Sequence, residues 1–442
     1  MIDVAYDMYS ERIANTRTVK HFGKVTQVIG LVIESAGPAV SIGRLCQIEN
    51  YDSDTRVLAE VVGFRDDRIL LMPLGPISGI SPGAIVTSTF EQLRLPVGKE
   101  LIGRILGGLG QPIDGHGPIA TTATRPINGR PISPLKRRRI AEPVRTGIRV
   151  IDLTCTVGKG QRMGIFSGSG VGKSVTLGMI ARGSSADVNV VALIGERGRE
   201  VREFIERDLG PEGMKNTVVV AVTSDEPALI RIKGAMLATT IAEYFRDLGM
   251  DVMLMMDSLT RIAMAQREIG IAIGEPPTTK GYTPSVFALL PNLLERAGLN
   301  DKGSITGLYT VLVEGDDFNE PISDAVRSIL DGHVALSRRL ASLNQYPAVD
   351  VLDSISRLMK DISKPEEAAL AAEAREIMSV YREAEDLINI GAYAKGSNPR
   401  IDRAITKMDE LNGLFRQAIM EEVDHEESVK RLGEILVDGK SK

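Results

Sequence analysis

The residues that most clearly indicate a chemical function lie in one short stretch, Ser167-Gly168-Ser169-Gly170-Val171-Gly172-Lys173-Ser174. Its three glycines let the backbone curl so that successive N–H groups point at an anion. Lys173 adds a positive charge for outer phosphates, and the hydroxyl of Ser174 is placed to bind Mg²⁺. The stretch therefore predicts a phosphate-binding loop for a nucleoside triphosphate. Its predicted contacts come from Ser169, Gly170, Val171, Gly172, Lys173, Ser174 and Val175.

The sequence on either side of this stretch supports that interpretation. Residues 163–166 are apolar, which is typical of a short buried strand, and residues 175–182 suit a helix. The positive N-terminal end of such a helix would face the phosphate. The pattern ordinarily begins with glycine, and Ser167 is a small residue that still fits the turn. An ordinary glycine-rich turn is the alternative, and the strand–loop–helix context argues against it.

Two carboxylates follow apolar runs. Asp257 closes the run 252–256, where a carboxylate next to a phosphate loop would hold Mg²⁺ directly or through water. Any strand can end in an aspartate, but parallel strands end at the ligand crevice. Glu196 follows the run 190–194 and would polarise an attacking water, with Arg197 reaching the γ-phosphate. The charges around Glu196 also suit a solvated helix start, so these residues alone leave both interpretations open.

Length and composition limit the class of protein. The chain has 442 residues, which suggests about three domains, and its 43% hydrophobic and 25% charged residues are typical of a globular protein. A net charge of −5 gives no general attraction to nucleic acid. Two cysteines, Cys46 and Cys155, suit a reducing compartment. With neither a signal-peptide core nor an apolar run of about 18 residues, we expect a cytoplasmic protein.

The sequence divides into three successive regions that differ in their pattern of apolar, Gly and Pro residues. Short β-rich runs split by Gly and Pro, at 24–33, 39–48, 57–64 and 68–73, predict a small β-barrel. A central region alternates a helical stretch at 231–248 with apolar runs that predict buried parallel strands, at 188–194, 218–223, 252–256 and 305–313. The last region is predicted to be helical at 365–391, 401–421 and 426–436.

Further motifs give the chain a family resemblance. They are Gly-Gln-Pro-Ile-Asp-Gly at 110–115, Gly-Glu-Arg-Gly-Arg-Glu at 195–200, Met-Asp-Ser-Leu-Thr-Arg at 256–261, Gly-Glu-Pro-Pro at 274–277, Ile-Leu-Asp-Gly-His at 329–333, Tyr-Pro-Ala-Val-Asp at 346–350 and Ser-Ile-Ser-Arg at 354–357. With the phosphate loop, they resemble the hexameric ATPases related to the catalytic subunits of rotary ATP synthases, and within them the flagellar protein export ATPases of the type III secretion family. The resemblance implies an α/β RecA-like P-loop core with an N-terminal β-barrel and a C-terminal helical domain. The corresponding domains are 1–22, a regulator-binding helix; 23–93, the barrel; 94–355, the ATPase domain; and 356–442, the helical domain.

The resemblance also implies roles for single residues. Glu196 would activate the attacking water, and Arg197 and Lys173 would hold phosphate. Ser174 and Asp257 would bind the metal directly or through water, and Arg357 would be an arginine finger. Tyr346 would stack on adenine, and Tyr393 would close the other side of the base pocket. One chain thus carries both the acid and the finger. Identical copies arranged head to tail would complete every site, and the family implies a homohexamer that binds ATP and Mg²⁺.

Partners follow from the same resemblance. Residues 1–20 would bind a regulatory dimer, although their apolar stripe could equally pack on the barrel. The loop 265–284 would face a central channel holding a coiled-coil stalk, with an ordinary surface loop as the alternative. The ring would meet an export gate, export substrates or chaperones. The expected location is cytoplasmic and peripheral at the inner face of the cell membrane. The basic run 136–139 is typical of a solvated surface, with contact to acidic lipid as the alternative.

Four other functions compete with flagellar export. A virulence-type secretion ATPase would share fold and chemistry, whereas an ion-translocating subunit is disfavoured because acid and finger share a chain. A hexameric RNA translocase needs aromatic stacking residues, of which the barrel region, with Tyr51 and Phe64, offers few. A nucleotide sensor without turnover would be unaffected by Glu196→Gln.

Overall fold

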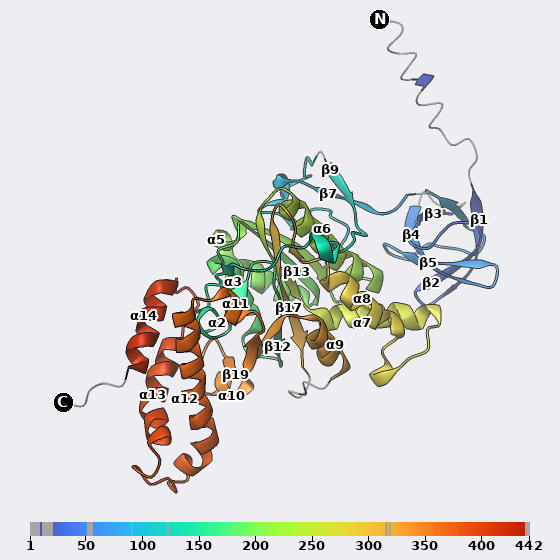
Figure 1. Cartoon of the computed structure of the whole chain (residues 1–442). Coiled ribbons are helices and arrows are strands. Elements are labelled where there is room, and N and C mark those ends of the chain that lie inside the picture. The colour runs from blue at the N-terminus through green and yellow to red at the C-terminus, as the bar shows by residue number, and fades with distance from the viewer. Residues whose placement is uncertain are drawn as a thin grey trace, which may run out of the picture. The chain divides into compact units, whose positions relative to one another are not determined.

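The chain divides into two units with separate hydrophobic cores. The computed structural model describes residues 9–10, 21–50, 56–89, 91–121, 123–313, 317 and 320–437 (Figure 1). One unit comprises Met1–Leu93 with Ile269–Glu275, and the other comprises Arg94–Glu268 with Pro276–Lys442. The N-terminal helix predicted within residues 1–20 lies outside the described residues, except for Tyr9 and Ser10.

The first unit is a closed β-barrel with the strand order β1-β2-β5-β4-β3-β6. Its strands are β1 (Phe22–Ile29), β2 (Val32–Ala36), β3 (Leu45–Glu49), β4 (Arg56–Arg65), β5 (Arg68–Pro73) and β6 (Ile85–Ser88). The predicted barrel is confirmed, and the β-rich run 24–33 forms parts of two strands. Gly30 takes a φ of +57°, which glycine tolerates, and this turn divides the run into β1 and β2. The run 39–48 forms a strand only from Leu45 onward.

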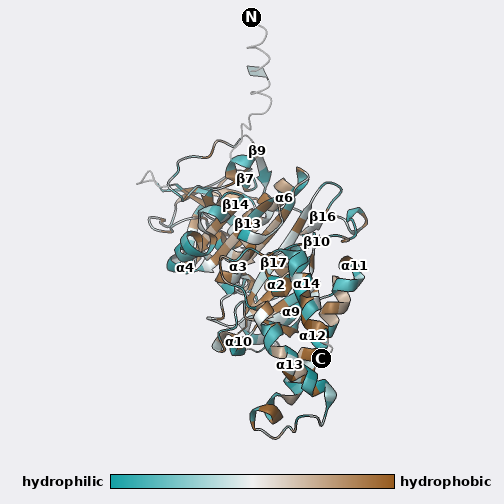
Figure 2. Ribbon diagram, turned by 90° about the vertical axis from the view of Figure 1, so that its left-hand side faces the viewer, coloured by the Kyte–Doolittle hydropathy of each residue, from teal (hydrophilic) through white to brown (hydrophobic). Residues whose placement is uncertain are grey.

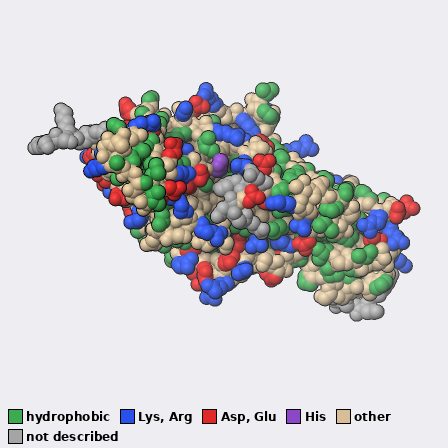
Figure 3. All heavy atoms as spheres, turned by 90° about the horizontal axis from the view of Figure 1, so that it is seen from below, with side chains coloured by type: hydrophobic (Ala, Val, Ile, Leu, Met, Phe, Trp, Pro, Cys, Tyr) green, Lys and Arg blue, Asp and Glu red, His purple; other side chains and the backbone are tan. Residues whose placement is uncertain are grey.

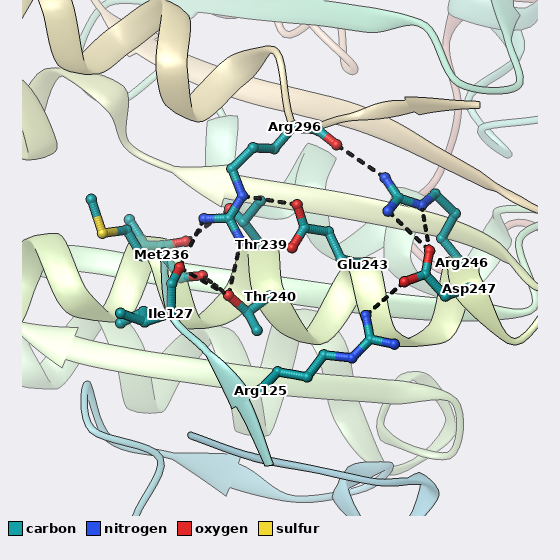
Figure 4. A network of polar contacts seen from close by, with 10 residues as sticks. Arg125, Ile127, Met236, Thr239, Thr240, Glu243, Arg246, Asp247 and Arg296 are labelled. Atoms are coloured by element: carbon teal, nitrogen blue, oxygen red, sulfur yellow. Dashed lines mark hydrogen bonds and ion pairs between the residues drawn. The ribbon is translucent and has the colours of Figure 1, made fainter. Parts of the chain in front are cut away.

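A connector leads into the second unit through the antiparallel pair β7 (Arg94–Val97) and β9 (Ala123–Pro126). A largely buried network of ion pairs fixes this connector to the helix α6 (Ala228–Asp247), as Figure 4 shows. Arg296 binds Glu243 with Nε and Nη2 at 2.9 and 2.7 Å, and its Nη1 donates to the carbonyl of Ile127. Arg125 donates to Asp247 at 2.7 Å. Because Arg296 and Glu243 are both buried, their pairing is needed to offset the cost of removing two charges from water.

The second unit is built on a nine-stranded sheet with the order β19-β18-β12-β17-β15-β13-β14-β8, and β16 pairs with β17 beside this path. The strands are β8 (Ile105–Leu106), β12 (Arg162–Ser167), β13 (Val188–Glu196), β14 (Thr217–Thr223), β15 (Asp251–Asp257), β16 (Gly298–Leu299), β17 (Ser304–Leu312), β18 (Gly332–Leu336) and β19 (Val349–Ser356). Strands β18 through β8 along this path are mutually parallel, and the edge strand β19 is antiparallel to β18. The predicted α/β core is confirmed, and its central strands are almost wholly buried.

Helices connect the strands of this sheet. Besides α6 they are α2 (Arg149–Thr154), α3 (Lys173–Gly183), α4 (Gly198–Glu203), α5 (Gly210–Met214), α7 (Leu259–Ile273), α8 (Pro284–Leu294), α9 (Pro321–Ile329), α10 (Arg338–Ser342) and α11 (Met359–Ile362), with a π-helical segment η3 (Phe204–Leu209) between α4 and α5. The loop predicted for 265–284 is therefore wrong in its first half. Apolar residues at helical spacing, including the buried Ala265 and Ile269, extend α7 to Ile273, and Gly274 ends it at a φ of +97°.

Three helices complete the second unit: α12 (Pro365–Asn389), α13 (Pro399–Phe415) and α14 (His425–Leu436). They bury small and aliphatic side chains against one another, and no described helix is long and apolar enough to cross a membrane. Figure 2 shows the hydrophilic residues on their outer sides, and Figure 3 shows basic and acidic side chains interspersed over one face of the molecule. The helix predicted for 401–421 is wrong at its end, because the chain leaves the helix after Phe415 to form a linker at 416–424.

Candidate active site

The predicted phosphate loop joins β12 to α3, as the sequence indicated. Gly170 and Gly172 take φ values of +78° and +89°, which an L side chain rarely adopts, so both glycines are required by the turn. Lys173 is the first residue of α3, and Gly172 precedes it as the N-cap. The unpaired N–H groups and the positive end of this 11-residue helix therefore meet the loop, as anion binding requires.

A cavity of about 630 Å³ opens over this loop. The residues that line it are Ser167, Gly168, Ser169, Gly170, Gly172, Lys173, Ser174, Val175, Glu196, Arg197, Glu200, Arg207, Thr260, Arg261, Met264, Leu312, Val313 and Arg338. Five of these side chains are cationic and two are acidic, so the lining favours an anion. Eight predicted residues therefore line one cavity: Ser169, Gly170, Gly172, Lys173, Ser174, Val175, Glu196 and Arg197. Val171, Asp257 and Tyr346 are not among the residues that line it.

The lysine of the loop lies between two carboxylates. Nζ of Lys173 lies 2.5 Å from Oδ1 of Asp257 and 3.4 Å from Oε1 of Glu196. Thr310 donates to the same Oδ1 at 2.7 Å. Glu196 ends β13 and Asp257 ends β15, and these parallel strands finish at the same sheet edge as β12. Burial alone would lower the pKa of Lys173, but the two carboxylates raise it, so the ammonium stays charged.

Glu196 has the protonation behaviour of a general base. Burial raises the pKa of Glu196 to about 7, Lys173 and Arg261 oppose this rise, and the charge of Asp257 and a hydrogen bond with Glu200 add to it. A base whose pKa lies near the working pH accepts a proton readily and still spends much of its time ionised. This carboxylate can therefore take a proton from a water molecule placed beside the phosphates.

Oxygen donors in and beside the cavity fit Mg²⁺ that arrives with phosphates. Ser174 lies in the first turn of α3, and Asp257 supplies a carboxylate at the same edge. Mg²⁺ in such sites is usually bound by one or two protein oxygens, with phosphates and water completing six ligands. Among the described residues no group of three or more His, Cys, Asp or Glu side chains offers a separate metal cage.

Tyr346 lies beside the phosphate loop. A Cβ added to Gly172 would come within 3.5 Å of the Tyr346 ring, and Tyr346 lies three residues before the start of β19 on this side of the sheet. Its carbonyl accepts a hydrogen bond from the backbone N–H of Gln417 at 2.9 Å. The Gln417 side chain in turn accepts from the N–H of Arg149 and donates to the carbonyl of Gly147. The linker after α13 is thus held next to Tyr346, a contact that the sequence analysis missed because it extended the helix through this segment.

Tyr393 lies elsewhere. It occupies the turn between α12 and α13, where its hydroxyl donates to the carbonyl of Asn398 at 2.9 Å and lies 3.1 Å from Asp402. It is not among the described residues that line the cavity. Its assignment to the base pocket stays a prediction.

Arg357 lies near the N-terminal ends of the parallel strands, whereas the phosphate loop lies at their C-terminal ends. Because β19 runs antiparallel to β18, Val349 pairs with Leu336 near the loop and Ser356 pairs with Gly332 at the far edge. The six residues of β12 span about 20 Å between these edges. Arg357 follows Ser356 and is exposed. In Figure 2, α11, which follows Arg357, lies on one side of the sheet, and α4 and α10 of the cavity lie on the other. The described part of the chain therefore places Arg357 away from its own cavity.

Three cationic residues of the cavity were not predicted: Arg207, Arg261 and Arg338. Arg261 closes the motif at 256–261, so that motif contained a usable signal. Arg207 comes from η3, where the buried carboxylate of Asp208 binds its Nε at 2.8 Å and its Nη2 at 3.3 Å. A π-helical turn shifts side chains by one position relative to an α-helix, and the residue pattern does not reveal it.

The fold and this site define a P-loop ATPase of the rotary ATP synthase type. Family models match the β-barrel domain of the ATP synthase alpha/beta family at residues 25–89, its nucleotide-binding domain at 147–356 and the T3SS EscN ATPase C-terminal domain at 363–434. The "Flagellum-specific ATP synthase" of Bacillus subtilis is 56% identical over 424 residues, which cover 94% of this chain and 95% of the relative. The chain belongs to the family of flagellum-specific and type III secretion system ATPases.

Solved structures agree with this assignment. The structure of the assembled ATPase EscN from enteropathogenic E. coli is 43% identical, with a TM-score of 0.89 over 94% of this chain and 100% of that one. EscN in complex with its central stalk EscO is 42% identical, with a TM-score of 0.86 over the same shares. The predicted family and fold class are confirmed, and the chain is an ATP hydrolase of this family.

Proposed function

We propose that this chain hydrolyses MgATP at the interfaces of a homohexameric ring and that turnover drives export of flagellar proteins through a type III secretion apparatus. The observation that carries the proposal is that Glu196 lies at the C-terminal ends of the parallel strands and Arg357 at their N-terminal ends. A head-to-tail contact between identical copies brings these two edges together and closes into a ring.

The cavity residues then have distinct roles. Lys173 and the loop N–H groups bind the phosphates, and Ser174 and Asp257 hold the Mg²⁺ that neutralises charge on them. Glu196 accepts the proton of the attacking water, and Arg197 contacts the γ-phosphate. Arg357 of the next copy stabilises charge that develops in the transition state, and Tyr346 stacks on the base.

Partners are proposed from the relatives. EscN binds a central stalk, EscO, and we assign the equivalent contact here to the loop 274–283. The regulatory dimer would bind within residues 1–20, and the export gate, substrates or chaperones would meet a ring at the cytoplasmic face of the membrane. The flagellar system is favoured over a virulence system, because identity is 56% with the flagellum-specific relative of Bacillus subtilis and 48% with the "Type 3 secretion system ATPase" of Xanthomonas euvesicatoria.

Mixing two inactive variants tests the shared site. Glu196→Gln lacks the base and Arg357→Ala lacks the finger, so each alone should lose about 10³-fold or more in rate while still binding ATP. A mixture contains interfaces that combine an intact Glu196 with an intact Arg357, and ATPase activity should reappear. A mixture that stays as inactive as its components, although the two variants co-assemble, would contradict the shared site.

A further inference from the structure

Hydrogen bonds fix the backbone of Arg357, the proposed arginine finger, at the N-terminal ends of the parallel strands. The backbone N–H of Arg357 donates to the carbonyl of Asp331 at 3.0 Å. Nε2 of Gln161 donates to the same carbonyl at 3.2 Å and to Oγ of Ser356 at 3.1 Å. Gln161 is fully buried, so this amide fixes both Asp331 and the residue that precedes the finger. The starting point of the Arg357 side chain is therefore set by Asp331.

Asp331 is held in turn by Arg162, the first residue of β12. Nε and Nη2 of Arg162 bind the two carboxylate oxygens at 3.1 and 3.2 Å. The backbone N–H of Arg162 also donates to Oδ2 at 3.1 Å, and the N–H of Asp331 donates to the Arg162 carbonyl at 2.9 Å. A bidentate guanidinium–carboxylate pair with two backbone bonds fixes orientation as well as distance. Arg162 thus immobilises the residue on which Arg357 rests.

The same guanidinium reaches the helix α8. Nη1 of Arg162 binds Glu295, the C-cap residue of α8, and Arg137 also binds Glu295 at 2.8 Å. The helix α8 begins directly after the loop 274–283. Arg162, at the N-terminal end of β12, therefore binds both the C-terminal end of α8 and Asp331, the residue to which the backbone of Arg357 is hydrogen-bonded.

We propose that Arg162 is a positioning residue for the arginine finger, which acts through Asp331 and is tied to α8 through Glu295. The proposal rests on the shared site described above. Arg162 does not contact the ATP of its own subunit, since it lies at the opposite end of β12 from the phosphate loop of its own chain. Its loss should therefore damage the site of the neighbouring subunit, which receives the finger, and spare ATP binding by its own subunit.

The first test separates positioning from binding and from folding. Arg162→Gln should lower kcat about 10²-fold, as a misplacement of about 1 Å can, with KM for ATP and binding of a fluorescent ATP analogue unchanged. Arg162→Lys keeps the charge but not the bidentate geometry, so it should recover part of the rate. The matched control is Arg137→Gln, which removes the other partner of Glu295 without touching Asp331 and should keep kcat within twofold. A rise in KM with kcat unchanged for Arg162→Gln, at an unaltered melting temperature, would overturn the proposal.

Mixed assemblies give the decisive readout. Arg162→Gln retains Glu196 but presents a misplaced finger, so mixing it with Glu196→Gln should restore activity. Mixing it with Arg357→Ala should not, because both components then lack a working finger. Recovery with Arg357→Ala but not with Glu196→Gln would mean that Arg162 serves its own phosphate loop and would overturn the inference. If Glu196→Gln and Arg357→Ala fail to complement each other, the shared site itself is wrong, and the inference that rests on it is wrong as well.

Discussion

At the scale of residues, the reactivity of the site comes from charges that are held close together away from water. Nζ of Lys173 lies within 3.4 Å of a carboxylate oxygen of Glu196 and of Asp257, and these neighbouring charges affect the pKa of Lys173 and of Glu196. Glu196 is the member whose pKa lies near neutrality, because burial disfavours its charged form. The rate of hydrolysis should therefore report the ionisation of this one carboxylate.

The pH dependence of kcat tests this expectation. Only ionised Glu196 can accept a proton, so kcat should fall about tenfold per pH unit below about 7 and reach a plateau above it. Glu200→Ala removes a hydrogen bond that raises the pKa of Glu196 and should move the midpoint to lower pH. The exposed pair Arg202–Glu206 offers a control, since Glu206→Gln should leave the profile unchanged. A flat profile from pH 6 to 8 would contradict the role of Glu196 as base.

At the scale of elements, the helix that begins at the phosphate loop is fixed by a close contact with η3. A Cβ on Gly178 of α3 would lie 2.5 Å from the carbonyl oxygen of Asp208, so only glycine fits there without a shift of backbone. The same segment of η3 carries Arg207 into the cavity. Packing between α3 and η3 therefore positions a lining residue as well as the loop.

Two glycine substitutions of the same kind should have opposite effects on stability. Gly178→Ala forces α3 away from η3 and should reduce the free energy of unfolding by about 1–3 kcal/mol. Gly413 lies in α13 with nothing within 4 Å of an added Cβ, so Gly413→Ala should raise that free energy by about 0.5–1 kcal/mol. Urea denaturation at constant pH measures both, and a stabilised Gly178→Ala protein would contradict the close contact.

Elements whose ends meet at the phosphate loop were predictable, because each carries its own signal. The glycines of the loop, the apolar run before Asp257 and the run before Glu196 all indicate strands that end in polar residues, and the structure brings these residues together. The linker at 416–424 was not predictable. Its contacts with Tyr346 and Gly147 are long-range, and the residues after Phe415 differ little in helix propensity from those before it.

The contacts around Arg357, at the N-terminal ends of the parallel strands, were predictable only in part. The motif at 354–357 pointed to Arg357, but neither Arg162 nor Asp331 carries a local signal for the bond between them. Their pairing depends on β12 and β18 lying side by side although they are far apart in the sequence. Residue spacing cannot indicate such a register, since it follows from the topology of the whole sheet.

At the scale of the whole molecule, the cavity lies at the C-terminal ends of the parallel strands and Arg357 lies at their N-terminal ends. Under the proposed shared site, a single copy is an incomplete catalyst. Specific ATPase activity should therefore rise steeply with protein concentration and level off once the ring has formed. Steady-state rates per subunit over two decades of concentration, with sedimentation at the same concentrations, measure this. Arg357→Ala should show no such rise in activity, even where it sediments with the wild-type mass. A constant rate per subunit would mean that each chain works alone.

The ion pairs that hold the connector respond to acid differently from the site. Burial alone would raise the pKa of Asp247, but Arg125 and Arg246 keep it below its ordinary value, and Arg104 does the same for Asp114. The stabilisation from such carboxylates is complete above their unfolded pKa of about 4 and is lost only as the pH falls through the lower folded value. Glu196 is protonated well before that range is reached. At pH 5.5 most copies of Glu196 would be protonated while these two ion pairs of the connector persist, so turnover would slow and would resume on neutralisation. Acid would thus switch the enzyme off through its own catalytic carboxylate, with no separate pH-sensing group.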